Sequence, residues 1–191
     1  GEWKSEIVFS ERDRVEVKFL NKIKENTTKS NIELAICLVK KNPMEIIFQK
    51  ATELGVYRII PIISERTEIK ELNHDRAKKI SIEATEQSSQ MLPPEILKVT
   101  KLKDFLENFN KNTKLLFADV NSKNNLRSDD LKDFESLCIL IGPEGDFTPS
   151  ERQSILSVSK VAPFTLSNNI LRTDTAVISA ISLVNFINNL P

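Results

Sequence analysis

The sequence predicts an α/β protein with a mostly parallel β-sheet and helices on both of its faces. Two nearly continuous apolar runs, at residues 32–39 and 137–141, are typical of strands that are covered on both sides. Proline follows a helix-capping residue at Asn42-Pro43 and at Thr148-Pro149, which is a favoured place for proline at a helix start. Because strands and helices alternate along most of the chain, we expect parallel strands joined by crossover helices.

The first 25 residues follow a different pattern. Apolar and polar residues alternate here, which predicts an antiparallel pair of strands with a turn near residues 10–14. The apolar positions are Ile7, Phe9, Val15, Val17 and Phe19. Two strands do not form a stable unit alone, so we expect them to dock on the rest of the chain or to belong to a small β domain. The polar stretch at residues 24–31 predicts a linker.

The next segment predicts a strand–helix–strand unit. The strand at residues 32–39 leads to a helix with Asn42 as its N-cap and Glu45 as its N3 residue. Apolar residues then recur at helical spacing up to Gly55, which stands where a helix-ending glycine belongs. A strand is expected at residues 58–63.

The alternation continues to the end of the chain. Asn73 caps a predicted helix that ends near Gln90, and Thr148-Pro149-Ser150-Glu151 is a capping box that opens a helix to about residue 158. Thr173 caps a final helix that runs through Leu190. The remaining predictions are a helix at residues 102–109 and strands at residues 115–120, 137–141 and 161–166. The polar stretch at residues 121–133 predicts an excursion on the surface.

The composition excludes several classes of protein. The chain has 191 residues with 27 basic and 27 acidic side chains, so its formal net charge is zero, and it has only 4 glycines. These values exclude collagen-like and glycine-rich low-complexity chains and indicate a globular protein. No apolar run approaches the roughly 18 residues that a transmembrane helix needs, and the first residues show no signal-peptide pattern.

Cysteine and histidine restrict the possible chemistry. Cys37 and Cys138 lie inside apolar runs, so we expect buried reduced thiols and a cytoplasmic protein. His74 is the only histidine, which argues against Ser-His-Asp and Cys-His catalysis. With so few cysteines and histidines, no metal site is expected.

The turn after the strand at residues 137–141 carries unusual chemistry. In Ile141-Gly142-Pro143-Glu144-Gly145, two of the 4 glycines of the chain lie close together. Glycine permits positive φ and close approach of the backbone, which suits a backbone cradle for a small ligand. The segment has neither the Walker A nor the dinucleotide-binding pattern, and a tight structural turn explains it equally well.

A second polar loop, at residues 166–173, joins a strand to the start of the final helix. Its Asn and Ser residues form tight side-chain turns and tolerate left-handed backbone. Arg172 comes just before the helix cap, at the positive end of the helix dipole, so an anionic partner such as a phosphate or a carboxylate is one explanation for it. A salt bridge with Asp174 or Glu144 is the other.

Three segments together resemble a known family. They are residues 42–67, which include Lys50-Ala51-Thr52-Glu53-Leu54-Gly55, residues 141–151 and residues 166–177. Together they are similar to bacterial 16S rRNA (uracil-N3) methyltransferases of the SPOUT superfamily, the RsmE family. The resemblance covers essentially the whole chain. It implies a SPOUT-type trefoil-knotted, mostly parallel sheet at residues 29–191, although knots are rare in proteins. It also implies that residues 1–28 are the closing strands of an incomplete PUA-like, RNA-binding β-barrel.

The resemblance further implies an activity. Such enzymes transfer a methyl group from S-adenosylmethionine to N3 of a uridine in 16S ribosomal RNA, within the small ribosomal subunit or its precursor. The sulfonium of the donor already activates the methyl group, so no metal is needed and positioning should dominate catalysis. The resemblance also implies a homodimer in the cytoplasm, with no membrane partner. The final helix carries an apolar stripe that would pack in the core, form part of the dimer interface, or do both; its residues are Val177, Ala180, Ile181, Val184 and Ile187.

The same resemblance implies roles for individual residues. Arg172 would orient the target nucleotide, and Glu144 would remove the N3 proton or orient its own loop. The cofactor would be bound, largely through backbone groups, by Ile141, Gly142, Pro143, Glu144, Gly145, Leu166, Ser167, Asn169, Ile170, Leu171 and Thr173.

Several positions depart from the family pattern. The usual Gln-Ser-Gly-Arg segment is Gln87-Ser88-Ser89-Gln90 here, so Ser89 replaces a glycine and Gln90 an arginine. The usual Leu-Gly-Pro-Arg is Leu166-Ser167-Asn168-Asn169, and Asp146 also replaces a glycine. Two other functions therefore stay open, because a fold alone does not determine activity. They are a non-catalytic RNA-binding or ribosome-assembly protein, and a knotted methyltransferase that acts on another RNA nucleotide.

Overall fold

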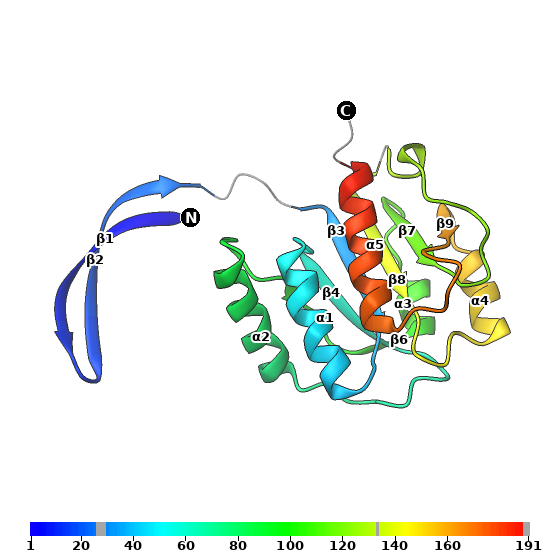
Figure 1. The fold of residues 1–191 in the computed structure, drawn as a ribbon, viewed down its shortest axis with the longest axis horizontal. Coiled ribbons are helices and arrows are strands. Elements are labelled where there is room, and N and C mark those ends of the chain that lie inside the picture. The colour runs from blue at the N-terminus through cyan, green and yellow to red at the C-terminus, as the bar shows by residue number, and fades with distance from the viewer. Residues whose placement is uncertain (26–29, 133, 189–191) are drawn as a thin grey trace.

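The computed structural model describes residues 1–25, 30–132 and 134–188. It contains a two-stranded hairpin followed by a domain with a seven-stranded sheet (Figure 1). The expected domain boundary between residues 28 and 29, residue 133 of the polar stretch, and Leu190 at the expected end of the final helix all lie outside the described residues.

The hairpin consists of β1 (Glu2–Glu11) and β2 (Arg14–Lys24), which pair antiparallel as the alternating pattern predicts. All residues of both strands are exposed, including Trp3 at 46% and Phe19 at 68%. The rings of these two residues meet edge to face, with their centroids 5.9 Å apart. In Figure 1 the hairpin is a long curved ribbon that stands beside the sheet domain. Its apolar residues therefore add nothing to the core of that domain.

The sheet has the strand order β5-β4-β3-β8-β7-β9, with β6 also beside β4, and each of these pairings is parallel. Its strands are β3 (Ile32–Cys37), β4 (Arg58–Ile63), β5 (Glu95–Ile96), β6 (Thr100–Lys101), β7 (Thr113–Ala118), β8 (Ser136–Ile141) and β9 (Val161–Phe164). Leu34 of β3 lies opposite Ile139 of β8 at the centre, which explains why both strands are apolar on both faces. The short strands β5 and β6 have no counterpart in the sequence prediction, because two residues show no periodicity.

Helices cover both faces of the sheet, which confirms the predicted α/β class. The helices α1 (Lys41–Glu53), α2 (His74–Gln87) and α5 (Thr173–Asn188) pack on one face, and α3 (Leu102–Glu107) and α4 (Pro149–Leu156) on the other (Figure 1). In β3, Leu34 and Ile36 join the core under α1, α2 and α5. Ala35 and Cys37, the alternate residues, join the core under α3 and α4.

Several of the predicted helix ends are confirmed. The side chain of Asn73 caps α2 by accepting a hydrogen bond from the Arg76 amide. Gly55 follows the end of α1 with a φ of 82°, as a helix-ending glycine should. At the start of α4, Thr148 and Glu151 form both hydrogen bonds of the capping box.

The predicted start of α1 is wrong. The helix begins at Lys41 with Lys40 as its N-cap, and no side chain caps it, so Asn42 lies inside the first turn. The carboxylate of Glu45, expected in a capping box, instead pairs with Arg76 of α2, whose Nη2 lies 2.9 Å from Oε2. Arg76, which is distant in sequence, thus binds the Glu45 carboxylate that was expected to cap the start of α1.

The two cysteines are buried and unpaired, as expected. Burial raises the pKa of the Cys37 thiol to about 12, so it stays protonated and unreactive at neutral pH. None of the helices in the described part of the chain is long and apolar enough to cross a membrane.

Candidate active site

A large cavity opens at the carboxyl edge of the sheet. Its volume is about 1040 Å³, and it is lined by the segments that follow β3, β7, β8 and β9. The carboxyl ends of parallel strands meet at one edge, which is where such sheets bind ligands. Pockets for a small molecule usually measure about 300–1,000 Å³, so this cavity has room for a large ligand or for two reacting groups.

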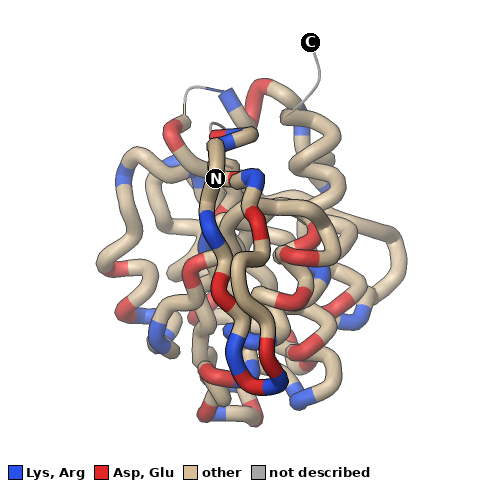
Figure 2. The backbone as a smooth tube through the Cα atoms, turned by 90° about the vertical axis from the view of Figure 1, so that its left-hand side faces the viewer, with Lys and Arg blue, Asp and Glu red and all other residues tan. Residues whose placement is uncertain are grey.

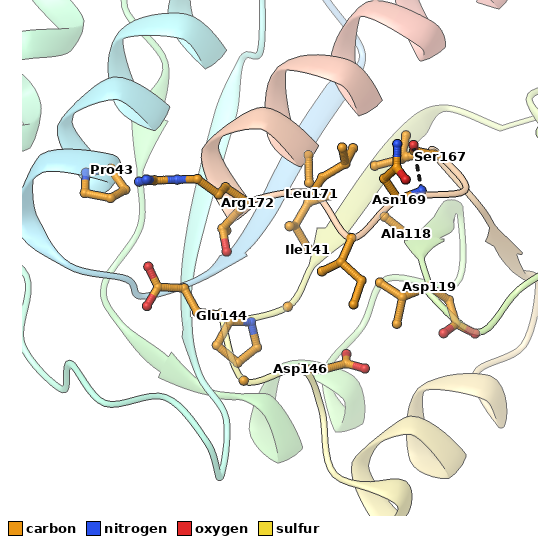
Figure 3. Close-up of a pocket in the computed structure, with 18 of the residues that line it drawn as sticks. Pro43, Ala118, Asp119, Ile141, Glu144, Asp146, Ser167, Asn169, Leu171 and Arg172 are labelled. Carbon is orange, nitrogen blue, oxygen red and sulfur yellow. Dashed lines mark hydrogen bonds between the residues drawn. The ribbon is translucent and has the colours of Figure 1, made fainter.

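The residues predicted to form the site line this cavity. They come from the loops after β8 and β9, which are separate in sequence and adjacent in space (Figure 3). The predicted cofactor-binding residues in the lining are Ile141, Gly142, Pro143, Glu144, Gly145, Leu166, Ser167, Asn169, Ile170, Leu171 and Thr173. Arg172 lines the cavity as well. The structure brings these residues together, and their individual roles stay predictions.

The glycines of the loop after β8 are used differently from the expectation. Neither Gly142 nor Gly145 has a positive φ; the left-handed residue of this loop is Asp146, with a φ of 58°. The Asp146 amide donates to the Pro143 carbonyl at 3.0 Å. A Cβ atom on Gly142 would lie 3.0 Å from the ring of Phe147. Gly142 therefore allows close packing within the protein, and the sharp bend falls at Asp146.

The loop after β9 is a tight polar turn with one strongly exposed apolar residue, Ile170. The Asn169 amide donates to Ser167 Oγ at 3.0 Å (Figure 3), and Thr165 Oγ1 donates to the Ser167 carbonyl at 3.2 Å. These bonds are the side-chain turns that the Asn and Ser residues predict. Ile170 lines the cavity and is 90% exposed. Such an aliphatic side chain can contact the apolar part of a ligand.

Arg172 and Glu144 come from different loops at the cavity. In Figure 3 the Arg172 side chain extends toward Pro43, and Glu144 lies on the loop below it. Arg172 Nε is 3.4 Å from Asp174 Oδ1, yet its side chain remains 72% exposed. So exposed an ion pair contributes at most about 1 kcal/mol. One of the two salt bridges considered for Arg172 is thus present, and its guanidinium stays accessible to a ligand.

Two parts of the lining have no counterpart in the sequence prediction. The first is the start of α1, where Lys40 and Lys41 lie. The second is the end of β7, where the buried Asp119 receives hydrogen bonds from Nε and Nη2 of Arg152 in α4. A carboxylate directly after a buried strand is the signal that could have marked Asp119. Across residues 1–25, 30–132 and 134–188, no three His, Cys, Asp or Glu side chains gather as metal ligands.

The family-like segment at residues 50–55 lies at the opposite edge of the sheet, where α1 ends and β4 begins. Lys50 pairs there with Glu53 at 2.8 Å, as expected for a solvated helix face. Gln90 Nε2 donates to the Thr52 carbonyl at 2.6 Å and so closes the carboxyl end of α1. Gln90, where the sequence departs from the family pattern, therefore packs against the end of α1 and does not line the cavity.

The chain is similar to known proteins over almost its whole length. Residues 24–185 match the RNA methyltransferase domain family. Over 190 residues the chain is 32% identical to the ribosomal RNA small subunit methyltransferase E of Rickettsia conorii. The aligned region covers 98% of this chain and 77% of that protein. The chain belongs to the ribosomal RNA small subunit methyltransferase E family. The resemblance seen in its motifs is thereby confirmed.

Solved structures support the same assignment for this methyltransferase. The ribosomal RNA small subunit methyltransferase E of Neisseria gonorrhoeae, bound to S-adenosyl methionine, matches with a TM-score of 0.88 at 28% identity, covering 97% of this chain and 78% of that one. A Legionella pneumophila protein in complex with the bound cofactor SAM matches with a TM-score of 0.79 at 28% identity, covering 96% and 78%. The parallel sheet with helices on both faces is thus shared with structures that hold the methyl donor.

Proposed function

We propose that this methyltransferase transfers a methyl group from S-adenosylmethionine to N3 of a uridine in 16S ribosomal RNA. Membership of the family supplies the coarser statement, a ribosomal RNA methyltransferase that uses S-adenosylmethionine. N3 of uridine as the methylated atom is a finer statement than family membership supplies, and it is part of our proposal. The observation that carries the proposal is the shared cavity, into which the two loops of the family pattern, at residues 141–145 and 166–173, converge.

The cavity suits S-adenosylmethionine as methyl donor. Ile141, Leu166 and Leu171 line it together with the backbone of the loop after β8, and pockets for cofactors usually combine apolar walls with a few polar groups. The exposed Ile170 can cover an aromatic ring such as adenine. When bound, the cofactor supplies a methyl group that its sulfonium already activates. The task of the protein is therefore to place the reacting atoms in line.

The start of α1 suits a phosphate of the target nucleotide. Lys40 and Lys41 line the cavity with Arg172, and the first turn of α1 contains no acidic residue. Cations at the positive end of a helix dipole gain nothing from the dipole, whereas an anion bound between them would benefit from both. Figure 2 shows basic and acidic residues interleaved on the face in view, and the net charge is +0. Local rather than overall charge would therefore attract the RNA.

Methylation at N3 also requires the loss of the N3 proton. Glu144 is an exposed carboxylate at the cavity, and we assign it to accept this proton or to orient its loop. Arg172, on the facing loop, would hold the nucleotide so that N3 faces the methyl group. The target base would have to leave its stack to enter the cavity.

The proposal extends to domain organisation and location. Residues 29–191 would form the SPOUT-type trefoil-knotted domain, and residues 1–28 the closing strands of a PUA-like barrel. The nine large apolar side chains that the hairpin exposes support the second part, because an isolated two-stranded hairpin is marginally stable. The protein would act in the cytoplasm on the small ribosomal subunit or its precursor. Buried, unpaired cysteines agree with a reducing compartment.

We also propose a homodimer with α5 in the interface. Phe186 of α5 is 67% exposed, so its ring is available to pack against a second copy of the chain. Phe186→Glu is expected to shift the particle from dimer to monomer in sedimentation analysis. Ile82→Glu, on an exposed position of α2, should leave the mass unchanged. A monomeric wild-type protein would contradict this part of the proposal.

Arg172 offers a direct test of the activity. Arg172→Ala should keep the wild-type affinity for S-adenosylmethionine in calorimetric titration and lose most methyl transfer to 16S ribosomal RNA, because the guanidinium contacts the nucleotide rather than the donor. Arg172→Lys should retain more activity, since it keeps the charge. Equal turnover by Arg172→Ala would remove this residue from the site.

The target is tested by mass spectrometry of 16S ribosomal RNA from a strain that lacks the gene. Loss of 3-methyluridine, restored by the wild-type gene, is the expected result. Unchanged 3-methyluridine would favour a different target nucleotide. Failure of the folded wild-type protein to bind S-adenosylmethionine would favour a non-catalytic role.

A further inference from the structure

The turn between β4 and α2 contacts the loop after β8 and the first turn of α4. The turn is built on a buried pair of hydroxyl residues, Ser64 at 3% and Thr67 at 2% exposure. Thr67 Oγ1 accepts from the Ser64 amide at 2.9 Å and lies 2.8 Å from Ser64 Oγ, and the Thr67 amide donates to the Ser64 carbonyl at 3.2 Å. These bonds make the turn a rigid base for the two exposed residues between them, Glu65 and Arg66.

Glu65 contacts the first turn of α4, and Arg66 contacts the segment between β8 and α4. The Glu65 amide donates to Glu151 Oε1 at 2.7 Å, and Glu151 Oε2 accepts from the Thr148 amide at 3.0 Å. Arg66 Nη1 donates to the Gly145 carbonyl at 2.9 Å. The turn therefore holds both the first turn of α4 and the middle of the loop that lines the cavity.

The bond from Arg66 determines the orientation of one peptide group. In a trans peptide the carbonyl oxygen of Gly145 and the amide hydrogen of Asp146 point in opposite directions. Arg66 donates to that carbonyl, and the Asp146 amide donates to the Pro143 carbonyl at 3.0 Å. Both sides of the peptide are thus engaged. This constraint supports the left-handed backbone of Asp146, which is unfavourable for a residue with a side chain.

We propose that Arg66 is a positioning residue for the methyl donor, acting through the Gly145 carbonyl on the loop at residues 142–147. This inference rests on the proposed function, in which that loop binds S-adenosylmethionine. Without the guanidinium, the peptide between Gly145 and Asp146 can rotate, and the loop samples shapes that do not fit the donor. Arg66 itself need not touch either substrate.

The test compares Arg66→Ala and Arg66→Lys with the wild-type protein by calorimetric titration of S-adenosylmethionine. A hydrogen bond to a charged donor is worth about tenfold in an equilibrium constant, so Arg66→Ala should bind the donor about tenfold more weakly. Arg66→Lys keeps one charged donor and should recover part of the loss. The KM for RNA should stay unchanged while the KM for the donor rises. Lys103→Ala, which removes an exposed ion-paired cation of α3, is the matched control and should bind normally.

Hydrogen exchange without any ligand separates this inference from the proposed function. Arg66→Ala should speed exchange of the Asp146 amide while amides of the central strand β8 and the thermal midpoint stay at wild-type values. Normal exchange at Asp146, or wild-type donor affinity in Arg66→Ala, would overturn the inference alone. Failure of the wild-type protein to bind the donor would overturn the proposed function as well.

Discussion

Two residues of this methyltransferase adopt left-handed backbone where the family pattern has glycine. Ser89 has a φ of 56° and Asp146 a φ of 58°. A residue with a side chain pays about 1–2 kcal/mol for this conformation, and glycine avoids that cost. The backbone at these two positions therefore has the conformation that glycine favours, and it stores strain. At Asp146 the side chain offsets part of the cost, because Oδ1 accepts a hydrogen bond from the Phe147 amide at 2.7 Å.

Ser89→Gly should stabilise the protein. Ser89 is exposed, so the substitution relieves backbone strain without opening the core, and we expect a gain of up to about 1 kcal/mol in the free energy of unfolding. Urea denaturation measures it. Ser88→Gly is the matched control: Ser88 has an ordinary φ of −89° and donates to the Ala84 carbonyl at 2.7 Å, so it should lose stability. A lower stability of Ser89→Gly than of the wild-type protein would contradict the inference that the backbone at Ser89 is strained.

The two loop glycines should respond differently to alanine. A Cβ at Gly142 would meet Cε2 of Phe147 at 3.0 Å, so Gly142→Ala should lower stability by about 1–3 kcal/mol through overpacking. At Gly145 the new methyl group would lie 3.5 Å from Arg66 Cβ, an ordinary contact, and the effect should stay within about 0.5 kcal/mol. Thermal unfolding without ligand checks both. Equal losses would show that the loop tolerates no side chain at either position.

Tyr57 should titrate at unusually high pH. Burial, with the hydrogen bond that its hydroxyl donates to the Glu33 carboxylate, raises the pKa of Tyr57 from 10.0 to about 12. The neutral Tyr57 hydroxyl therefore contributes to the free energy of unfolding in full below about pH 10, and this contribution is lost as the pH rises toward about 12. Because Tyr57 is the only tyrosine, phenolate absorbance reports it directly. An apparent pKa near 10 in the folded protein would contradict the buried contact, and Tyr57→Phe should abolish the signal.

At the scale of the elements, the same sequence signal had two outcomes. Asn42 and Thr148 each precede proline and stand three residues before a glutamate. Only Thr148 forms the capping box, because Glu151 stays within reach of its own helix start. Glu45 pairs with Arg76, 31 residues away, and α1 begins without a side-chain cap. A local motif thus predicts that a helix starts nearby. Whether its glutamate caps the helix depends on whether a distant residue forms an ion pair with that glutamate.

Thr148→Ala should weaken α4. Loss of an N-cap hydroxyl typically costs about 1 kcal/mol, and here the Glu151 amide would lose its acceptor at 3.2 Å. Chemical denaturation should show this loss. Ser150→Ala changes an exposed hydroxyl in the same helix turn and should be nearly neutral. Equal stability of the two variants would mean that the box contributes nothing.

At the scale of the whole molecule, the hairpin and the sheet domain should unfold independently. The only tryptophan, Trp3, lies in the hairpin, and all residues of β1 and β2 are exposed. The helices and the parallel sheet belong to the other part, with its own core. Tryptophan fluorescence should therefore change at lower urea concentration than far-ultraviolet circular dichroism. Coincident transitions would show a single cooperative unit.

The sequence by itself determined the local elements and half of the site. Apolar periodicity, proline and capping residues located the strands and helices, and the glycine-containing and Asn-rich loops marked two walls of the cavity. These features depend on neighbours along the chain. The strand order, Lys41 and Asp119 in the lining, and the bond from Arg66 to Gly145, 79 residues apart, were decided only by the tertiary structure. The physical reason is that a contact between distant residues leaves no periodic or local pattern in the sequence.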